Sequence, residues 1–592
     1  MVEPGRQRQA PPQDEPADPG PFNAYDAAPS LPIPGNRIET GYEPMARMIA
    51  TAVRNGARHI AIDGFGGVPW ERLRTSLDTH CRALGLFLTW RDVNDNLLNE
   101  SELDARIAPF LGGNDPLFGR LFDGNLLDFF DTARLRSARD EPDNGLVAVY
   151  GAGAALAGTP DLLIYADLPK DMIQRSLRKG TATNLGTQRP LPFAEAYKRA
   201  YFVDWPALNR HKARLLPDID RFIDPQDPEV PVSISGDDFR AALDEIACHP
   251  FRVRPWFAPG PWGGQFLKRH VQGLDQDVPN YAWSFELIVP ENGLVLGSDA
   301  RLECSFDFLM YHAHERVLGR AAARFGYAFP IRFDYLDTID GGNLSIQCHP
   351  RPDYIREWFG EPFTQDESYY IVTCTPGARV YLGFRDGVDP SRFREVVETS
   401  HEQGSTVPID DYVNSAPARP HDLFVIPSGT IHASGTGNLV LEISATPYIY
   451  TFKIYDWMRR DLEGNLRPLN IERAWDNLDF GRREAYAHDR LRPEPHLLAE
   501  GPGWREWFLG THDDIFYAVH RYDVDGEMPV HTDNRCHVLN VVDGEAVTVE
   551  TSDGRRARFN NGETFVIPAA AGNHTLAPVG NGPCQLVKAF VK

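Results

Sequence analysis

The chain contains 592 residues, of which 42% are hydrophobic and 24% are charged, as is typical of a soluble globular protein. Its formal net charge of −23, with no basic stripe, argues against a general nucleic-acid binder. One hydrophobic core cannot organise a chain of this length, so about three or four domains are expected.

Cysteine usage and hydropathy define the expected compartment. The seven cysteines are scattered and show no C-x-x-C spacing, which favours free thiols in a reducing compartment. The N-terminal segment is rich in proline and charge and lacks the apolar stretch of a signal peptide. No apolar run approaches the roughly 18 residues that a membrane span needs. We therefore expect a cytoplasmic protein with no membrane partner.

The first two segments are predicted to be a tail and an α/β domain. Residues 1–36 are rich in Pro, Gln, Asp and Gly, so we expect them to be disordered. Apolar runs then alternate with amphipathic stretches over 37–231, which predicts helices on a mainly parallel sheet. The acidic, proline-rich segment FIDPQDPEVP marks the predicted end of this domain.

A glycine-rich loop lies near the start of this domain. HIAIDGFGGVPWERL (59–73) has the order strand, loop, helix, and carries Gly64, Gly66 and Gly67. A working phosphate loop reads GxxxxGK[ST], whereas Val-Pro-Trp follows the glycines here. With LVAVYGAGAALAGTPDLLIYADLP, the domain resembles P-loop nucleoside or uridine kinases. Without the lysine, phosphoryl transfer lacks a main source of charge stabilisation. We predict a structural or regulatory kinase-like domain, with residual nucleotide binding as the alternative.

The remaining chain is predicted to be mainly β-structure. Residues 232–496 mix helical segments with short apolar strands separated by Gly, Pro, Asn and Asp, and 497–592 is strand-rich. HDLFVIPSGTIHASG (421–435) is echoed by NGETFVIPAAAGNHTL (561–576), which predicts two related barrels. The second barrel has His531 and His537 but no Q-x-H pair and no evident acidic ligand, so we expect it to be structural.

Four residues of the first barrel predict a divalent-metal site. Gln347 and His349 alternate with Cys348 in one strand, so they point to the same face. Glu367 opens the strand-like run ESYYI, and His432 follows a Pro-x-Gly turn. Two imidazoles, a carboxylate and an amide oxygen suit zinc or another first-row divalent ion. A set of at most four protein ligands leaves room for substrate, as an enzyme requires.

The sequence segments around these residues resemble those of a known family. They are PWGGQFL, FPIRFDYLDTIDGGNLSIQCHP, ESYYIV, HDLFVIPSGTIHASGTGNLVLEIS and TFKIYDWMR, in this order from residue 261 to 459. Residues from about 250 to 592 resemble the type I phosphomannose isomerases, which are zinc-dependent cupin enzymes that interconvert mannose 6-phosphate and fructose 6-phosphate. The resemblance implies a multidomain fold, in which the kinase-like α/β domain precedes a cupin isomerase region with a helical insert and a second, C-terminal cupin-like barrel.

The resemblance also implies roles for individual residues. The metal, one zinc ion per chain or another divalent ion, would be held by Gln347, His349, Glu367 and His432; Ser345 and Trp262 would contact a sugar phosphate; Lys453 and Glu442 would act in catalysis. The proton would be moved by Glu442 or by a metal-bound hydroxide, while Lys453 holds the developing charge.

Three positions depart from the family pattern. Lys453 replaces an arginine, and lysine lacks the planar fork that binds phosphate or a diol through two hydrogen bonds. Asp334 stands where a lysine is usual, and Trp283 stands where an acid is usual. These departures concern the substrate more than the metal. The alternatives are therefore an isomerase of a different sugar or sugar phosphate, and a non-catalytic sugar-sensing bicupin.

Overall fold

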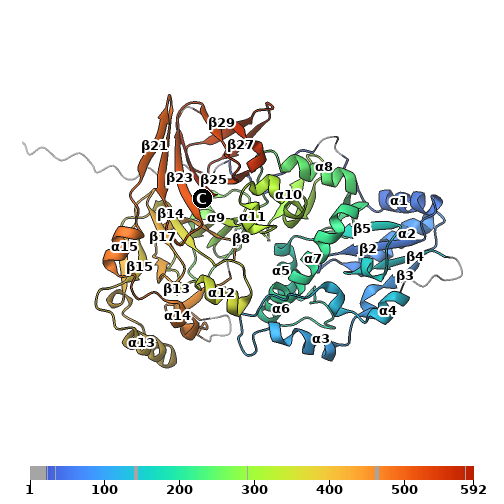
Figure 1. The fold of residues 1–592 in the computed structure, drawn as a ribbon, viewed down its shortest axis with the longest axis horizontal. Coiled ribbons are helices and arrows are strands. Elements are labelled where there is room, and N and C mark those ends of the chain that lie inside the picture. The colour runs from blue at the N-terminus through green and yellow to red at the C-terminus, as the bar shows by residue number, and fades with distance from the viewer. Residues whose placement is uncertain are drawn as a thin grey trace, which may run out of the picture.

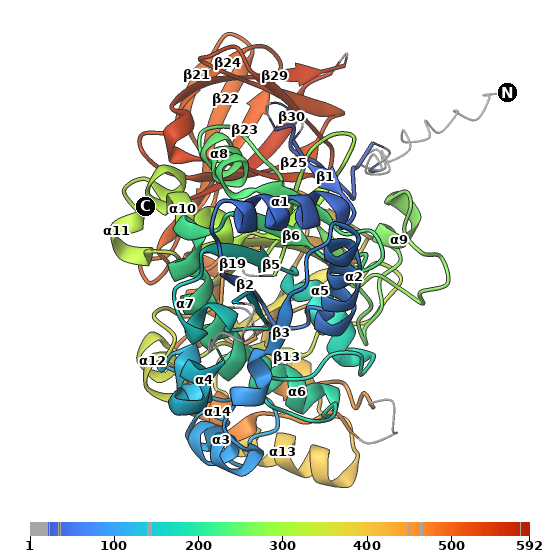
Figure 2. The same ribbon diagram turned by 90° about the vertical axis from the view of Figure 1, so that its right-hand side faces the viewer.

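The computed structural model describes residues 22, 24–33, 35, 37–138, 145–289, 291–447, 449–460, 466–580 and 582–592. The fold has three parts: an N-terminal α/β domain, a middle β-unit with helical insertions, and a C-terminal β-unit, which forms one end of the molecule (Figure 1; Figure 2). Among the described residues, no helix combines the length and the apolar character needed to cross a bilayer.

The α/β domain is built on one seven-stranded sheet with the order β1-β7-β6-β5-β2-β4-β3. Its five strands from β6 to β3 are parallel, as the alternating pattern predicts. The strands are β1 (Glu39–Thr40), β2 (His59–Gly64), β3 (Thr89–Asp92), β4 (Val147–Tyr150), β5 (Leu162–Ala166), β6 (Arg221–Asp224) and β7 (Val232–Ser235). The helices are α1 (Glu43–Arg54), α2 (Trp70–Ala83), α3 (Glu100–Ile107), α4 (Thr132–Ser137), α5 (Lys170–Arg178), α6 (Phe193–Arg199), α7 (Trp205–Leu215) and α8 (Gly236–Ile246).

The predicted domain boundary at residue 231 is wrong. Strand β7 lies beyond it and pairs antiparallel with β6, with Phe222 opposite Ile234. Helix α8 follows directly and buries Phe239 against Phe222, with ring centroids 4.3 Å apart. The proline-rich segment that reads as a linker is a tight connection between two neighbouring strands, so the domain continues to about residue 246.

The end of the predicted disordered tail is ordered. Residues 1–21 lie outside the described residues, but Phe22 and Tyr25 are buried. The Tyr25 hydroxyl donates a 2.5 Å hydrogen bond to Glu286, and Phe22 packs 5.5 Å from the ring of Tyr335. The prediction of disorder is therefore wrong for 24–33, because two aromatic side chains anchor an otherwise polar segment.

The middle β-unit consists of two antiparallel sheets that face each other across the candidate site. The six-stranded sheet contains β17 (Leu423–Ile426), β14 (Glu367–Cys374), β19 (Asn438–Ala445), β12 (Ile331–Asp337), β9 (Trp283–Leu287) and β8 (Trp256–Ala258). The five-stranded sheet contains β16 (Val413–Pro417), β15 (Arg379–Phe384), β18 (His432–Ser434), β13 (Ile346–Cys348) and β20 (Phe452–Tyr455). A hairpin and helices surround them: β10 (Gly293–Leu296), β11 (Leu302–Ser305), α9 (Phe266–His270), α10 (Asp307–Leu318), α11 (Ala322–Phe325), α12 (Pro352–Phe359), α13 (Pro390–Gln403), α14 (Ile471–Asn477) and α15 (Glu484–Arg490).

The C-terminal β-unit repeats this two-sheet plan. One sheet contains β21 (His496–Gly501), β22 (Trp504–Gly510), β23 (Tyr517–Val524), β30 (Cys584–Val591), β25 (His537–Asp543) and β28 (Thr564–Ile567). The other contains β24 (Met528–His531), β29 (Asn573–Val579), β26 (Ala546–Thr551) and β27 (Arg556–Asn560). Its start at residue 496 lies next to the predicted boundary at 497.

A buried carboxyl joins the α/β domain to the middle β-unit. Glu361 accepts hydrogen bonds from Tyr450 (2.8 Å) and from Tyr201 of the α/β domain (3.2 Å). The backbone carbonyl of Tyr450 accepts a 3.0 Å hydrogen bond from Nδ1 of His349. Burial raises the pKa of Glu361 to about 7, although the two tyrosine hydroxyls oppose this effect.

We expect Glu361→Gln to stabilise the protein at pH 8. The folded pKa of Glu361 lies above the unfolded one, so its contribution to stability is complete below pH 4.5 and is lost as pH rises through 7. Glutamine keeps a hydrogen-bond acceptor and does not ionise, so the free energy of unfolding should rise by about 3 kcal/mol at pH 8. Urea unfolding at pH 5 and pH 8 tests this; an equal difference at both pH values would contradict it.

Candidate metal site

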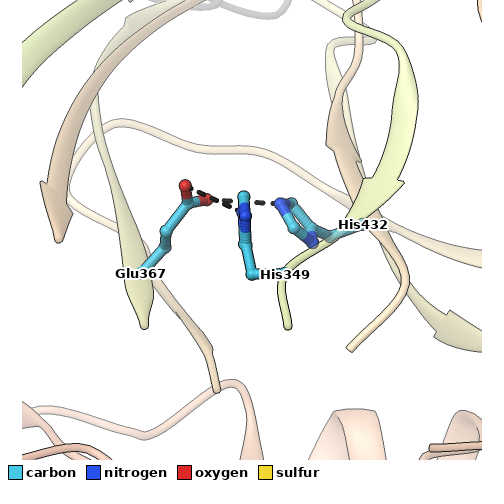
Figure 3. A group of neighbouring side chains, drawn as sticks. All are labelled: His349, Glu367 and His432. Atoms are coloured by element: carbon cyan, nitrogen blue, oxygen red, sulfur yellow. Dashed lines mark ion pairs between the residues drawn. The ribbon is translucent and has the colours of Figure 1, made fainter. Parts of the chain in front are cut away.

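Three residues from three strand ends form a converging set of metal donors (Figure 3). His349 follows β13, Glu367 begins β14 and His432 begins β18, and all three are almost fully buried. Nε2 of His349 lies 2.9 Å from one Glu367 carboxylate oxygen, and Nε2 of His432 lies 3.2 Å from the other. Such spacings suit donors that share one ion with bonds of about 2.0–2.2 Å.

Backbone carbonyls fix the orientation of both imidazoles. Nδ1 of His349 bonds the Tyr450 carbonyl at 3.0 Å, and Nδ1 of His432 bonds the Thr430 carbonyl at 2.9 Å. A carbonyl is only an acceptor, so Nδ1 carries the proton in each ring and the Nε2 lone pair points inward. This is the tautomer that a metal ligand requires.

The donor set fits a divalent cation such as zinc. Among the described residues, Nε2 of His349 and one Glu367 oxygen have no hydrogen-bond partner although both are buried. Burial opposes ionisation of Glu367, but the two adjacent imidazoles hold its pKa well below the usual range. The group therefore presents a carboxylate beside two imidazole nitrogens, and a cation would complete the missing interactions.

The structure places Gln347 beside these three residues. Gln347 lies opposite His432 in the β13–β18 pairing, and its side-chain nitrogen is 3.4 Å from Nε2 of His432. Its oxygen accepts a 3.0 Å hydrogen bond from Ser345. The nitrogen and oxygen of an amide are exchanged by a flip, so rotation presents the oxygen to the same point. Ser345 and Gln347 are adjacent on one strand face, as their spacing predicts.

Lys453 reaches the same side from the neighbouring strand. It lies opposite Gln347 in the β13–β20 pairing, so Lys453, Gln347 and His432 form one row across three strands. Burial, together with the nearby charge of Arg467, lowers the pKa of Lys453 to about 8. Arg467 and Arg459 both pair with the buried carboxylate of Asp456, whose charge also acts on Lys453.

Glu442 is held by a cation that the sequence interpretation did not identify. Arg332 forms an ion pair with Glu442 and another with Asp334 at 2.9 Å, and Ser444 donates to Glu442 at 3.0 Å. Glu442 lies directly opposite Asp334, and Glu367 lies opposite Ser444, so these groups face one interior. Arg332 stands two residues before Asp334, so strand alternation already puts both on one face.

Trp262 lies at the edge of the middle β-unit. Its indole nitrogen donates a 3.1 Å hydrogen bond to the carbonyl of Asp337, and its ring meets Trp283 edge-on at 4.3 Å. The departure at Trp283 is thus explained locally, because the two indoles pack together where the family pattern has an acid.

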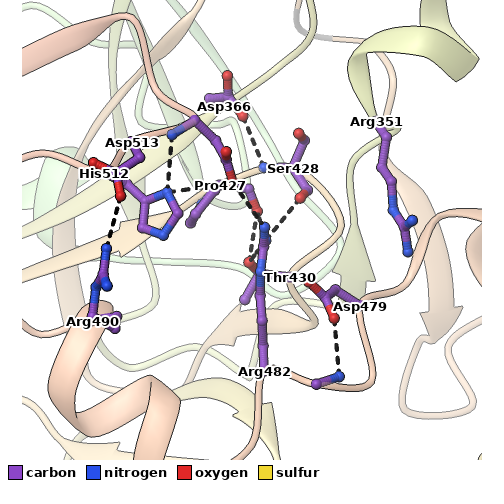
Figure 4. Close-up of polar contacts among 12 residues, drawn as sticks. Arg351, Asp366, Pro427, Ser428, Thr430, Asp479, Arg482, Arg490, His512 and Asp513 are labelled. Atoms are coloured by element: carbon purple, nitrogen blue, oxygen red, sulfur yellow. Dashed lines mark hydrogen bonds and ion pairs between the residues drawn. The ribbon is translucent and has the colours of Figure 1, made fainter.

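A second functional residue that sequence reasoning missed is Arg482, which supports the turn before His432 (Figure 4). Its guanidinium donates 2.8 Å hydrogen bonds to the carbonyls of Pro427 and Ser428 and also bonds the Thr430 side chain. Asp366 accepts from the Ser428 backbone N–H at 2.8 Å. These contacts hold the Thr430 carbonyl that orients His432. No local pattern indicates this, because Arg482 approaches from the helical connector.

The glycine-rich loop of the α/β domain lies beside a cavity of about 930 Å³. Loops that follow the carboxyl ends of the parallel strands contribute to its lining, and none of the described residues that line it is Lys or Arg. Lys170 and Lys212 are fully buried near Phe65 and pair with Asp307 and Asp167. Lys212 also lies 3.7 Å from Asp307, so both cations link the domain to the middle β-unit, and neither lines the cavity among the described residues.

Comparison with known proteins divides the chain into two parts. Residues 41–248 match a family model described as "Domain of unknown function (DUF8485)". The chain is 24% identical to the mannose-6-phosphate isomerase ManA of Bacillus subtilis (strain 168), over 58% of this chain and 96% of that protein. It is 27% identical to the mannose-6-phosphate isomerase of Streptococcus mutans, over 37% of this chain and 65% of that protein.

Solved structures show a parallel similarity. The crystal structure of the mannose 6-phosphate isomerase from Bacillus subtilis matches with a TM-score of 0.47 and 21% identity, over 58% of this chain and 99% of that one. A zinc-bound mannose 6-phosphate isomerase matches with a TM-score of 0.42 and 14% identity, over 58% and 100%. The C-terminal part of this chain is thus similar to mannose-6-phosphate isomerases, whereas the α/β domain matches a family with no assigned function.

Proposed function

We propose that this protein is a metal-dependent aldose–ketose isomerase that interconverts mannose 6-phosphate and fructose 6-phosphate through an enediol. The observation that carries the proposal is the His349–Glu367–His432 donor set, in a segment similar to named isomerases over nearly their whole length. We propose zinc as the ion, with Gln347 as a fourth ligand. When bound, zinc polarises the substrate carbonyl and stabilises the negative charge that develops beside it.

The protein residues supply proton transfer and positioning. We assign Glu442 as the base that moves a proton between C1 and C2, with Arg332 and Ser444 holding its carboxylate in place. Lys453, in its protonated form, stabilises the enediol oxygen. Ser345 and Trp262 contact the sugar, and Arg459 and Arg467 provide positive charge for the phosphate. Anchoring the distant phosphate positions the reacting carbons.

The direct test is a coupled assay of fructose 6-phosphate formation from mannose 6-phosphate. We expect turnover by the purified protein, loss of turnover after chelation, and recovery with zinc. Absence of turnover by zinc-loaded protein would overturn the proposal. A binding signal for sugar without turnover would instead identify a sensor.

A second candidate is an isomerase of another sugar. It is favoured by two groups in the pocket, the single ammonium of Lys453 and the carboxyl of Asp334, whose pKa burial raises to about 6. Faster turnover of unphosphorylated mannose than of mannose 6-phosphate would establish this candidate, because the phosphate end would then have no role.

We further propose that the α/β domain is a kinase-like domain with a degenerate phosphate loop, acting as a structural or regulatory part of a cytoplasmic enzyme. The buried pairing of Lys170 and Lys212 leaves the loop without a free cation among the described residues that line the cavity. We expect no ATP hydrolysis with Mg²⁺ by the intact protein. Phosphate release above a control without protein would contradict this.

A further inference from the structure

The strand registers of the two β-units correspond, so residues of the metal site have counterparts in the C-terminal unit. The FVIP repeat aligns Ile426 with Ile567, and these residues pair with Glu367 and His537. His432 pairs with Gln347, as His574 pairs with Val530. The same registers place Lys588 where Glu442 lies. The correspondences are Gln347 with Val530, His349 with Thr532, Glu367 with His537, His432 with His574, Glu442 with Lys588 and Asp334 with His520.

His574, the counterpart of His432, has the same ring orientation. Nδ1 of His432 bonds the carbonyl two residues earlier, and Nδ1 of His574 does the same with the Gly572 carbonyl at 3.1 Å. Nε2 of His574 therefore faces inward, as Nε2 of His432 does. Within the part of the chain that the structure describes, this nitrogen has no hydrogen-bond partner, and neither has Nδ1 of His537, although both residues are 4% exposed.

The charge of this interior is inverted relative to the metal site. Three acids of the middle β-unit have basic counterparts in the C-terminal unit: Glu367 corresponds to His537, Glu442 to Lys588 and Asp334 to His520.

Basic groups surround the ring of Phe590. The His520 ring lies 4.8 Å from it, Nζ of Lys588 4.9 Å, the Arg535 guanidinium carbon 5.2 Å and the His537 ring 5.9 Å. Glu506 pairs with His520 and Lys588 of this cluster.

A metal does not fit this arrangement. Among the described residues, only the His349–Glu367–His432 group brings three such donors together. Burial lowers the pKa of His537 far below its usual range, and the neighbouring Lys588, His574 and His520 lower it further. Lys588 and Arg535 lie at this interior beside buried imidazole nitrogens that lack partners among the described residues, and this arrangement suits an anion instead.

We propose that the C-terminal β-unit binds a small oxyanion of the phosphate class between Lys588 and the imidazoles of His537 and His574. The Lys588 ammonium supplies charge, and His537, on the neighbouring strand of the same sheet, supplies a hydrogen bond. Nε2 of His574, on the facing sheet, accepts a hydrogen bond from the protonated oxygen of the hydrogen phosphate ion, because its Nδ1 carries the ring proton. Arg535, whose Nε has no partner among the described residues, lies at the same ring and adds a second cation. The free ion and the phosphate group of a sugar phosphate share this chemistry.

Crystals of the intact, zinc-loaded protein grown with sodium arsenate test the location. Anomalous scattering at the arsenic edge should show a peak within hydrogen-bonding reach of Lys588 and His574. Absence of the peak at saturating arsenate would overturn the proposal. Metal analysis should give one zinc ion per chain. A second zinc ion per chain that is lost in His574→Gln would also overturn the proposal, because the C-terminal site would then bind metal.

Calorimetry with inorganic phosphate tests the energetics in the Arg467→Met background, which weakens phosphate binding at the first site. Lys588→Met should weaken the remaining phosphate binding by about tenfold or more. Lys592→Met, at the end of the same chain segment, should leave it unchanged. Equal binding in both variants would contradict the proposal. If the protein binds mannose 6-phosphate but not mannose, and Lys588→Met weakens this binding, the ligand is a sugar phosphate. If it binds only inorganic phosphate, the ligand is the free ion.

Discussion

Replacing Glu367 by glutamine is expected to abolish isomerase turnover by removing the bound metal. The carboxylate lies between two imidazole nitrogens at 2.9 and 3.2 Å and supplies the only negative charge among the donors. Changes to residues that merely orient metal ligands cost about 10–100-fold in affinity, so loss of a charged ligand should cost at least about 100-fold. Zinc content measured by mass spectrometry, together with kcat, checks this.

Two comparisons separate this effect from misfolding. The exposed variant Glu500→Gln should keep full zinc content and turnover. In the wild-type protein, zinc should raise the thermal midpoint, because a ligand that binds only the folded state stabilises it. Glu367→Gln should lose this zinc-dependent shift while staying folded. A variant that retains stoichiometric zinc would contradict the assignment of Glu367 as a ligand.

Changing Lys453 is expected to alter turnover and its pH dependence without changing metal content. Removing one group that stabilises transition-state charge costs about 10²–10³ in kcat, which is the loss expected for Lys453→Met. The pKa of Lys453 is lowered to about 8, first by burial and then by Arg467. Because the protonated form is the active one, the wild-type kcat should fall as pH rises above about 8.

Lys453→Arg is the matched test of this pH dependence. A guanidinium keeps its charge to far higher pH, so the alkaline decline should disappear while some activity remains. The measurement is kcat between pH 6 and 10 with zinc content monitored. An unchanged alkaline limb in Lys453→Arg would show that another group titrates there, and undiminished kcat in Lys453→Met would remove Lys453 from the reaction.

The metal donors are the part of the site that sequence reasoning reaches best. Gln347 and His349 share a face because strand side chains alternate, and the structure brings His349 to Glu367 and His432, and Gln347 to His432. The alternation of apolar and amphipathic segments likewise predicts the parallel sheet of the α/β domain. Local composition is less reliable at boundaries, since a proline-rich strand connection and an anchored polar tail both read as unstructured.

The sequence alone therefore predicted the candidate metal donors, the strand faces that carry them and the repeat that relates the two β-units. Only the tertiary structure decided which charges meet: Arg332 with Glu442, Arg482 with the turn before His432, and Lys588 with Glu506. The physical reason is that side-chain alternation is a local property of a strand, whereas the partner across a sheet is set by long-range register. The sequence alone does not show whether a glutamate such as Glu442 is ion-paired, because its cationic partner is brought beside it only by the strand register.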